Sequence, residues 1–488
     1  MNAIQKFISF DKNSEMAVYL QIANAIINSI RRGWLRKGLK LPASRELAIE
    51  LKVHRKTIIA SYEELLSQGW IEMKSRKGTF VAEHLPDVKP SKIVLEEKLE
   101  NYPSTTFFKI DEGRIILFPT RNFQNSKNLI INDGFPDLRL APMELLMREL
   151  RTIAKGSSSR KYLMYGNPSG SPDLLEVLSA SLNKSRGLTI TERNIIITSG
   201  AQMAIYLAAN LILKRGDHVI VGEPSYFAAN LTFQQAGATL NRVPVDNDGM
   251  DMNVVERLCK TKKIRLVYVI PHHHHPTTVT LSPNRRIKLL ELARKHKFAI
   301  IEDDYDFDFH YAGNPILPMA SLDHHGSIIY IGTLSKTIAP AVRLGFMVAP
   351  ENFIKSASSL RRGIDRQGDS LLEMAVAELY KNGTLARYIK KSVKIYHERR
   401  DYFCKLLRDE LRQKITFKVP DGGMSVWVNF NKTDLKKLSS EVAKQGLILS
   451  DGSAHNTDGK NYNSTRLGFA SLNFKEQETA IRILRSCM

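Results

Sequence analysis

The sequence has few cysteines, comparatively few acidic residues and no long apolar run. Three cysteines, Cys259, Cys404 and Cys487, are far apart and odd in number, so neither a disulfide framework nor a zinc knuckle is expected. No run of about 18 apolar residues occurs, which argues against a membrane span. The N-terminal segment lacks a long apolar core, so we expect no signal peptide and a reduced, cytoplasmic location.

Acidic residues are outnumbered along the chain. The 488 residues include 71 Lys and Arg against 50 Asp and Glu, a formal net charge of +21. Such an excess favours a polyanionic partner, which could be nucleic acid, an anionic membrane surface or a phosphate ligand. The length exceeds that of one ordinary domain, so at least two domains are expected.

Three regions differ in their patterns. Residues 1–82 predict three helices followed by two short strands that are joined by a basic turn. Residues 83–125 are punctuated by prolines and predict an interdomain linker, with a short helix near Val94–Leu99. In residues 126–488, apolar strand-like runs alternate with helical stretches, which predicts an α/β domain with a largely parallel sheet.

The helices of the first region follow from local signals. Apolar residues at every fourth position from Val18 to Ile30 predict the first helix. The second is expected over Ser44–Leu51, with Ser44 as its N-cap, and the third over His54–Ser67. The expected strands are Trp70–Met73 and Thr79–Ala82.

Three helices with a basic hairpin describe a winged helix, a fold whose third helix reads base edges in the major groove. Arg can contact guanine through two hydrogen bonds, whereas Lys and Thr reach phosphate or base. A solvated basic hairpin that binds nothing is the alternative. The residues expected to contact double-stranded DNA are Ser44, Arg45, Arg55, Lys56, Thr57, Arg76 and Lys77.

The first region also resembles the GntR-type winged-helix domain over nearly all of residues 17–82, and this resemblance implies DNA binding. The motifs that carry it are Tyr19-Leu-Gln-Ile22, Gly38-x-x-Leu41-Pro-Ala-Ser-Arg-Glu-Leu-Ala48, Val53-x-Arg55-x-Thr57 and Gly78-Thr-Phe-Val81.

Lys336 is the first candidate for covalent chemistry, because it follows the expected strand Ile328–Ile331. A lysine at a strand end among polar groups can form a Schiff base with an aldehyde cofactor. Most lysines are surface charges, so the assignment depends on the neighbours. Thr333, Ser335 and Arg343 lie close by in the sequence and together can hold a phosphate.

Acidic residues follow the apolar strand Phe298–Ile301, in Glu302-Asp-Asp-Tyr305. Successive acids are costly there unless they are exposed or paired, and a pyridinium nitrogen is one suitable partner. A metal-binding cluster and a strand end in solvent are the alternatives. Ser199-Gly-Ala-Gln202 opens a helix whose N–H groups suit a phosphate, and Tyr226 can stack on an aromatic ring.

The ordered motifs of residues 130–488 resemble the fold-type I aminotransferases, and most closely the MocR-type regulators of the GntR family. The resemblance implies pyridoxal 5'-phosphate as cofactor and a head-to-tail homodimer. The matching motifs are Tyr165-Gly-Asn-Pro-Ser-Gly170, Ser199-Gly-Ala-Gln202, Gly216-Asp217, Glu223-x-x-x-Phe227, Glu302-Asp-Asp-Tyr305, Gly332-Thr-Leu-Ser-Lys336 and Arg343-Leu-Gly345.

The same resemblance implies a role for each matching residue. Lys336 carries the internal aldimine, and Asp303 pairs with the pyridine nitrogen. Tyr305 binds the phenolic oxygen, Tyr226 stacks on the ring, and Arg466 holds the α-carboxylate of an amino ligand. The residues implied around the phosphate are Ser199, Ala201, Gln202, Thr333, Ser335 and Arg343, together with Tyr165, which reaches the phosphate of a partner subunit.

Some positions depart from the family pattern. In Pro271-His-His-His-His-Pro276-Thr-Thr278, His275 precedes the proline and Thr278 replaces a glycine. We expect no metal site in His272–His275, because adjacent residues cannot all face one ion. His310 stands where the family often has Arg, and Ala228 stands where GABA-sensing members have an additional Arg, which argues against GABA as the effector.

The sequence therefore predicts an N-terminal α+β winged helix-turn-helix domain (1–82), a linker (83–125) and an α/β aminotransferase-like domain (126–488). Together they predict a transcription regulator that senses an amino acid, an amine or pyridoxal phosphate itself. One alternative is an aminotransferase with an incidental DNA-binding extension, and another is a nonspecific nucleic-acid binder.

Overall fold

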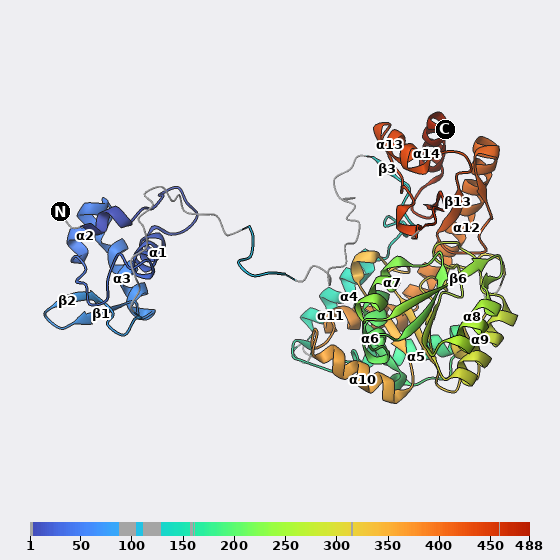
Figure 1. Ribbon diagram of the computed structural model, residues 1–488, viewed down its shortest axis with the longest axis horizontal. Helices are drawn as coiled ribbons and strands as arrows, with labels where there is room; N and C mark the ends of the chain where they lie inside the picture. The colour runs from blue at the N-terminus through green and yellow to red at the C-terminus, as the bar shows by residue number, and fades with distance from the viewer. Residues whose placement is uncertain are drawn as a thin grey trace. The chain divides into compact units, whose positions relative to one another are not determined.

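The computed structural model describes residues 3–86, 104–110, 128–156, 160, 162–313, 316–457 and 459–488. The chain divides into two compact units, Met1–Ile110 and Asp111–Met488 (Figure 1). The helix expected near Val94–Leu99 and most of the expected linker lie outside the described residues. Within the described ranges, no helix combines the length and the apolar character needed to cross a bilayer.

In its described residues, the first unit contains three α-helices and a hairpin, as predicted. A core forms between the helices because each turns one apolar face inward, with Ile22, Leu47 and Ile58 fully buried. The strands pair antiparallel, and Lys74 lies opposite Gly78 at the turn. The elements are η1 (Ala3–Phe7), α1 (Val18–Arg31), α2 (Ser44–Leu51), α3 (Arg55–Ser67), β1 (Ile71–Lys74) and β2 (Gly78–Val81).

Two helix starts in this unit differ from the prediction. Ser44 is the first residue of α2 and not its N-cap; Ala43 takes that place, and its N–H donates to the Glu46 carboxylate at 3.1 Å. His54 is the N-cap of α3, because its Nδ1 accepts the N–H of Lys56 at 3.1 Å. In both cases a side-chain acceptor close to the turn satisfies a free N–H group and sets the boundary.

An eight-stranded sheet, in the order β4-β11-β10-β9-β8-β5-β6-β7, forms the centre of the second unit. The pairings among β10, β9, β8, β5 and β6 are parallel, which confirms the predicted largely parallel sheet, whereas β11 and β7 pair antiparallel with their neighbours. The strands are β4 (Ile195–Thr198), β5 (His218–Glu223), β6 (Thr239–Asp246), β7 (Gly249–Met250), β8 (Ile264–Val269), β9 (Ala299–Asp303), β10 (Ile328–Thr333) and β11 (Gly345–Val348).

Both faces of this sheet are covered by helices, and successive strand residues therefore enter different cores. Ile195 and Ile197 belong to one buried cluster, while Ile196 belongs to the other. The first cluster includes residues of α4 (Met143–Lys155), α5 (Pro172–Arg186), α8 (Met252–Thr261), α9 (Pro283–His296) and α11 (Ser370–Lys381). The second includes residues of α6 (Ala201–Ile212), α7 (Phe227–Gln235) and α10 (Glu351–Arg362).

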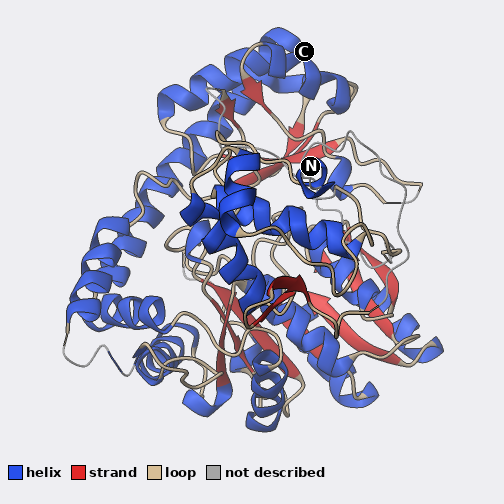
Figure 2. Cartoon of the chain, turned by 90° about the vertical axis from the view of Figure 1, so that its left-hand side faces the viewer, coloured by secondary structure: helices blue, strands red, loops and turns tan. Residues whose placement is uncertain are grey.

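The C-terminal part of the second unit has its own core around a three-stranded antiparallel sheet, β12-β13-β15 (Figure 2). A short parallel pair, β14 with β3, brings residues near 130 to this lobe. The N–H of Gly468, the last residue of β15, donates to the Asn132 carbonyl at 2.8 Å, so the segment after β3 lies next to the strand that carries Arg466. The elements are β3 (Leu129–Ile130), α12 (Thr384–Leu411), β12 (Thr416–Phe417), β13 (Ser425–Asn429), α13 (Leu435–Lys444), β14 (Leu447–Ile448), β15 (Ser464–Gly468) and α14 (Phe474–Cys487).

Candidate functional site

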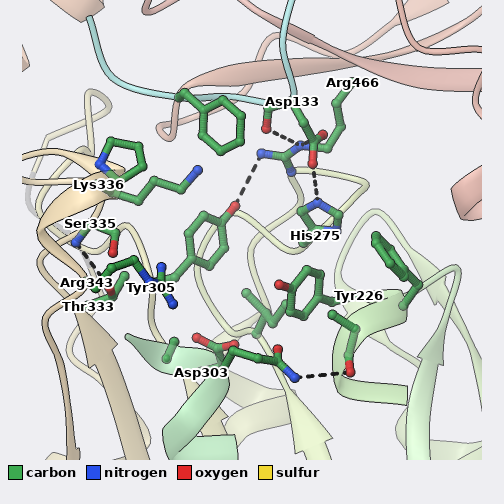
Figure 3. Close-up of a pocket in the computed structure, with 17 residues that line it drawn as sticks. Asp133, Tyr226, His275, Asp303, Tyr305, Thr333, Ser335, Lys336, Arg343 and Arg466 are labelled. Carbon is green, nitrogen blue, oxygen red and sulfur yellow. Dashed lines mark hydrogen bonds and ion pairs between the residues drawn. The ribbon is translucent and has the colours of Figure 1, made fainter. Parts of the chain in front are cut away.

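A cavity of about 370 Å³ lies where β5, β8, β9 and β10 end (Figure 3). These strands are parallel, so the side chains that follow them meet at one edge of the sheet, where ligands bind in open α/β folds. The residues predicted from the sequence to bind the cofactor or the ligand that line the cavity are Ala201, Gln202, Tyr226, Asp303, Tyr305, Thr333, Ser335, Lys336, Arg343 and Arg466.

Ser199 and Tyr165 are the two predicted site residues that do not line the cavity. The Ser199 carbonyl nevertheless accepts a hydrogen bond from Arg343 Nη2 at 2.9 Å, so it orients a residue that does. The Tyr165 side chain is exposed, and the guanidinium of Arg366 lies 4.5 Å from its ring centroid.

Lys336 has the environment of a nucleophilic amine. Its Nζ donates to the carbonyl of Gly134 at 2.6 Å and lies 4.5 Å from the ring centroid of Phe135. Burial lowers the pKa of Lys336 to about 8, although the charge of Asp133 opposes this shift. A larger fraction of neutral amine is therefore present near neutral pH than for an exposed lysine.

Asp303, the last residue of β9, is buried and only half satisfied. Its Oδ2 accepts the hydroxyl of Tyr268 at 2.7 Å, while Oδ1 has no hydrogen-bond partner among the described residues. Burial raises the pKa of Asp303 to about 7. An unpaired buried carboxylate oxygen is costly, so this position suits a ligand that brings a cationic N–H group.

The two neighbouring acids are satisfied by other parts of the chain. Glu302 accepts the N–H groups of Met319 and Ala320 at 2.7 and 2.8 Å. Asp304 contacts Nδ1 of His272 at 2.9 Å and accepts the hydroxyl of Tyr330 at 2.8 Å. The carboxylates of Glu302, Asp303 and Asp304 therefore lie in three different environments. Of these three residues, Asp303 lines the cavity.

Anion-binding groups gather between α6 and the end of β10. Ala201 is the first residue of α6, whose N-terminal N–H groups favour negative charge. The preceding Gly200 has φ +81°, and a Cβ there would lie 2.7 Å from Nη2 of Arg343. The Oγ of Ser335 is buried and, within the described parts of the chain, has no hydrogen-bond partner. A guanidinium, a free hydroxyl and a helix N-terminus together suit a phosphate.

Gln202 is directed partly away from this anion site. Its Nε2 donates to Oγ1 of Thr232 at 2.8 Å, and this bond ties the amide to α7. Tyr226, at the start of the same helix, packs edge-on against His275, with their ring centroids 5.1 Å apart. Tyr305 donates its hydroxyl to the carbonyl of His273 at 3.1 Å.

The opposite end of the cavity contains a charge pair that the sequence reasoning missed. Arg466 is buried, and its Nε lies 2.9 Å from Oδ1 of Asp133. The other oxygen of Asp133 lies 2.9 Å from Nε2 of His275 (Figure 3). Asp133 follows β3 in a short polar turn, and such turns are too common for this one to have been singled out.

The four adjacent histidines have four different partners. His272 contacts Asp304, His273 contacts Asp306 at 2.9 Å, and His274 contacts Thr277 at 2.9 Å. His275 alone of the four lines the cavity. The cluster in the sequence is therefore divided between structural contacts and one position at the site.

The predicted DNA-contacting residues lie at two places in the first unit. Arg55 and Lys56 are exposed in the first turn of α3, Arg45 is exposed on α2, and Thr57 is half-buried. Ser44 Oγ accepts from Arg55 Nε at 3.4 Å, which shows that the starts of α2 and α3 are adjacent. Arg76 and Lys77 are exposed at the turn of the hairpin, where Arg76 has φ +59°.

A winged helix on the same chain as an aminotransferase fold, with a lysine and a carboxylate at its strand ends, defines a class of DNA-binding regulator. The chain belongs to the aminotransferase class I and II family, which it matches over residues 140–484, and to the MocR-type subfamily of GntR regulators. Residues 18–81 match the bacterial regulatory proteins of the gntR family.

Named relatives agree with this assignment over nearly the full length. The probable rhizopine catabolism regulatory protein MocR of Rhizobium meliloti is 28% identical over 480 residues, which cover 98% of this chain and 94% of that protein. The uncharacterized HTH-type transcriptional regulator YisV of Bacillus subtilis is 28% identical over 472 residues, 96% of each chain. These matches confirm the predicted transcription regulator and support it over an aminotransferase with an incidental extension.

Solved structures resemble the second unit. The kynurenine aminotransferase of Pyrococcus horikoshii has a TM-score of 0.72 and 29% identity, covering 78% of this chain and 96% of that one. An archaeal alanine:glyoxylate aminotransferase has a TM-score of 0.70 and 32% identity, covering 74% and 91%. The predicted fold-type I aminotransferase-like domain is thereby confirmed, and its fold family depends on pyridoxal phosphate.

Proposed function

We propose that this regulator binds pyridoxal 5'-phosphate at Lys336 and changes its DNA binding when an amino compound, or the cofactor itself, occupies the cavity. The observation that carries the proposal is the half-satisfied carboxylate of Asp303 in the same cavity as the Lys336 amine. Such an unpaired oxygen needs a donor, and a protonated pyridine nitrogen supplies one.

The other cavity residues fit the remaining parts of the cofactor. Arg343, the Ser335 hydroxyl and the start of α6 would hold the phosphate, and Tyr226 would lie against the ring. When bound, pyridoxal phosphate supplies an aldehyde that joins reversibly to a primary amine of the protein or of a ligand. Lys336 is the amine of this chain that is buried among these groups.

On the DNA side, we propose that the starts of α2 and α3 and the hairpin turn contact the duplex. Their exposed cations support this, because phosphate neutralisation supplies much of the affinity for DNA. We further propose a head-to-tail homodimer that binds two half-sites, a cytoplasmic location, and domains bounded as the sequence predicts (1–82 and 126–488, joined by 83–125). In a dimer, the exposed Tyr165 would reach the phosphate of the partner subunit.

The first test is cofactor attachment. Purified protein mixed with pyridoxal phosphate is expected to develop an absorbance band, and borohydride is expected to fix the cofactor on the peptide that contains Lys336. Lys336→Ala should lose both signals. A wild-type protein that stays colourless, with no mass added at Lys336, would refute the proposal.

The second test is coupling to DNA. A duplex from the region upstream of the gene is titrated with the loaded protein, and fluorescence anisotropy is followed with and without a panel of amino acids and amines. We expect at least one compound to change both the cofactor spectrum and the DNA affinity, because a ligand shifts an equilibrium only through differential binding. A spectrum that responds while DNA binding never does would point instead to an aminotransferase.

A further inference from the structure

We propose that Asp133, held in place by His275, recognises a second, cationic amino group of the effector, beside Arg466, which binds the effector's carboxylate. The effector would then be an amino acid that carries another amine. This inference rests on the proposed function, because it assigns the cavity residues that the cofactor leaves free.

The charges that line the cavity lead to this assignment. Lys336, Arg343 and Asp303 would be used by the cofactor. The charged side chains that remain on the lining are Arg466 and Asp133, and they form a pair with Nε and Oδ1 2.9 Å apart. The part of the cavity that faces an effector therefore presents one cation and one anion side by side.

Asp133 is open to a ligand, whereas Arg466 is enclosed. The Asp133 side chain is 46% exposed, against 2% for Arg466. Oδ1 of Asp133 contacts Arg466, and Oδ2 contacts His275. Because a carboxylate can accept about four hydrogen bonds, Asp133 can accept further hydrogen bonds from a ligand. The segment that carries Asp133 is held in place, because the Gly134 N–H donates to Oδ1 of Asn132 at 3.0 Å and the Asn132 carbonyl accepts the Gly468 N–H at 2.8 Å.

His275 holds Asp133 in place with a donated hydrogen bond. Its Nε2 faces a carboxylate, which only accepts, so Nε2 carries the proton and donates to Asp133. Burial lowers the pKa of His275, so the ring is neutral and does not offset the charge of Asp133. That negative charge therefore stays available to a cation of the ligand.

A simple amino acid fits this arrangement poorly. Its carboxylate would approach an Arg466 whose charge Asp133 already offsets, and it would place a second negative charge beside Asp133. A second ammonium group on the ligand removes this repulsion and donates to Asp133. The site therefore distinguishes amino acids with a second amine from simple amino acids by charge pairing as well as by fit.

The test compares amino acids that differ only in this amine. After cofactor loading has been verified, the spectrum of the full-length holo-protein is titrated with three matched pairs. These are L-lysine and L-norleucine, L-ornithine and L-norvaline, and L-2,4-diaminobutyrate and L-2-aminobutyrate. We expect at least one diamino acid to bind roughly tenfold or more tightly than its partner, the usual effect of a hydrogen bond to a charged group.

Variants test whether Asp133 causes the preference for diamino acids. Asp133→Asn should weaken the favoured diamino acid by roughly tenfold or more while leaving its neutral partner unchanged or tighter, because Arg466 is released. Asp246→Asn, at a surface ion pair with Arg285, is the control and should behave as wild type.

The outcomes separate the two proposals. If the protein does not load the cofactor, the proposed function fails and this inference falls with it. If the protein loads but no pair shows a preference, or Asp133→Asn retains the preference, the inference alone is overturned. A parallel loss for both members of a pair in Asp133→Asn would also overturn it, because that result indicates a general defect.

Discussion

Raising the pH should accelerate attachment of pyridoxal phosphate to Lys336, and the rate should level off above about pH 8. Only the neutral amine attacks an aldehyde, and burial holds the pKa of Lys336 at about 8. At pH 7 about one lysine in ten would be neutral, against about three in ten thousand for an ordinary lysine. The fraction of neutral amine at pH 7 is therefore roughly 300 times larger than for an ordinary lysine, which favours faster attachment.

The assay is the initial rate of absorbance change on mixing with the cofactor, measured from pH 6 to pH 10. Between pH 6 and 7 the rate should rise roughly tenfold, since the neutral fraction rises tenfold per pH unit well below the pKa. Asp133→Asn removes a charge that favours the ammonium form, so its plateau should begin at lower pH. A rate that keeps climbing through pH 10 would show that Lys336 is not desolvated and would refute the reasoning.

Substitutions at three other positions test the cofactor site and the DNA-contacting surface. Asp303→Asn should weaken cofactor binding, measured by dialysis. In the apoprotein, burial raises the pKa of Asp303 to about 7, which is above its value in the unfolded chain. Protonation of Asp303 therefore stabilises the folded state by roughly 4 kcal/mol below about pH 4. This contribution is lost as the pH rises through 7. Thermal unfolding of the cofactor-free protein at pH 5 and pH 8 should therefore differ more for wild type than for Asp303→Asn, and equal differences would contradict the burial argument. Gly200→Ala should also weaken cofactor binding, because φ is +81° there and the new Cβ would displace Arg343; unchanged binding would place the phosphate elsewhere. Arg55→Ala should lower DNA affinity by about 1–3 kcal/mol in an anisotropy titration, with Lys184→Ala on α5 as the control, and an unaltered affinity would place Arg55 off the DNA.

Short elements were predicted well where neighbouring residues decide them. The apolar run Ile195–Thr198 is β4 to the residue, and Ser44–Leu51 is α2. The strand expected over Phe298–Ile301 instead covers Ala299–Asp303. Two acids are accommodated at its end because Glu302 is bound by Met319 and Ala320, and Asp303 by Tyr268. Those partners lie on separate elements, so a local pattern cannot reveal them.

Some residues of the candidate site could likewise be predicted from local sequence, and others could not. Lys336, Asp303 and Arg343 were selected from motifs, and they line one cavity because parallel strands end at a common edge. Asp133 was missed, because its importance comes from Arg466, which is 333 residues away along the chain. Nothing in the short segment around Asp133 indicates such a partner.

Periodicity, turn residues and ordered motifs were sufficient for the two fold classes, most element positions and the chemistry of the strand ends. The tertiary structure decided which Asp303 oxygen is left without a partner, that Asp133 neutralises Arg466, and that His275 is the histidine at the cavity. The physical reason is range. Capping and hydrophobic periodicity act between residues a few positions apart, whereas burial and charge pairing act between any groups that packing brings together.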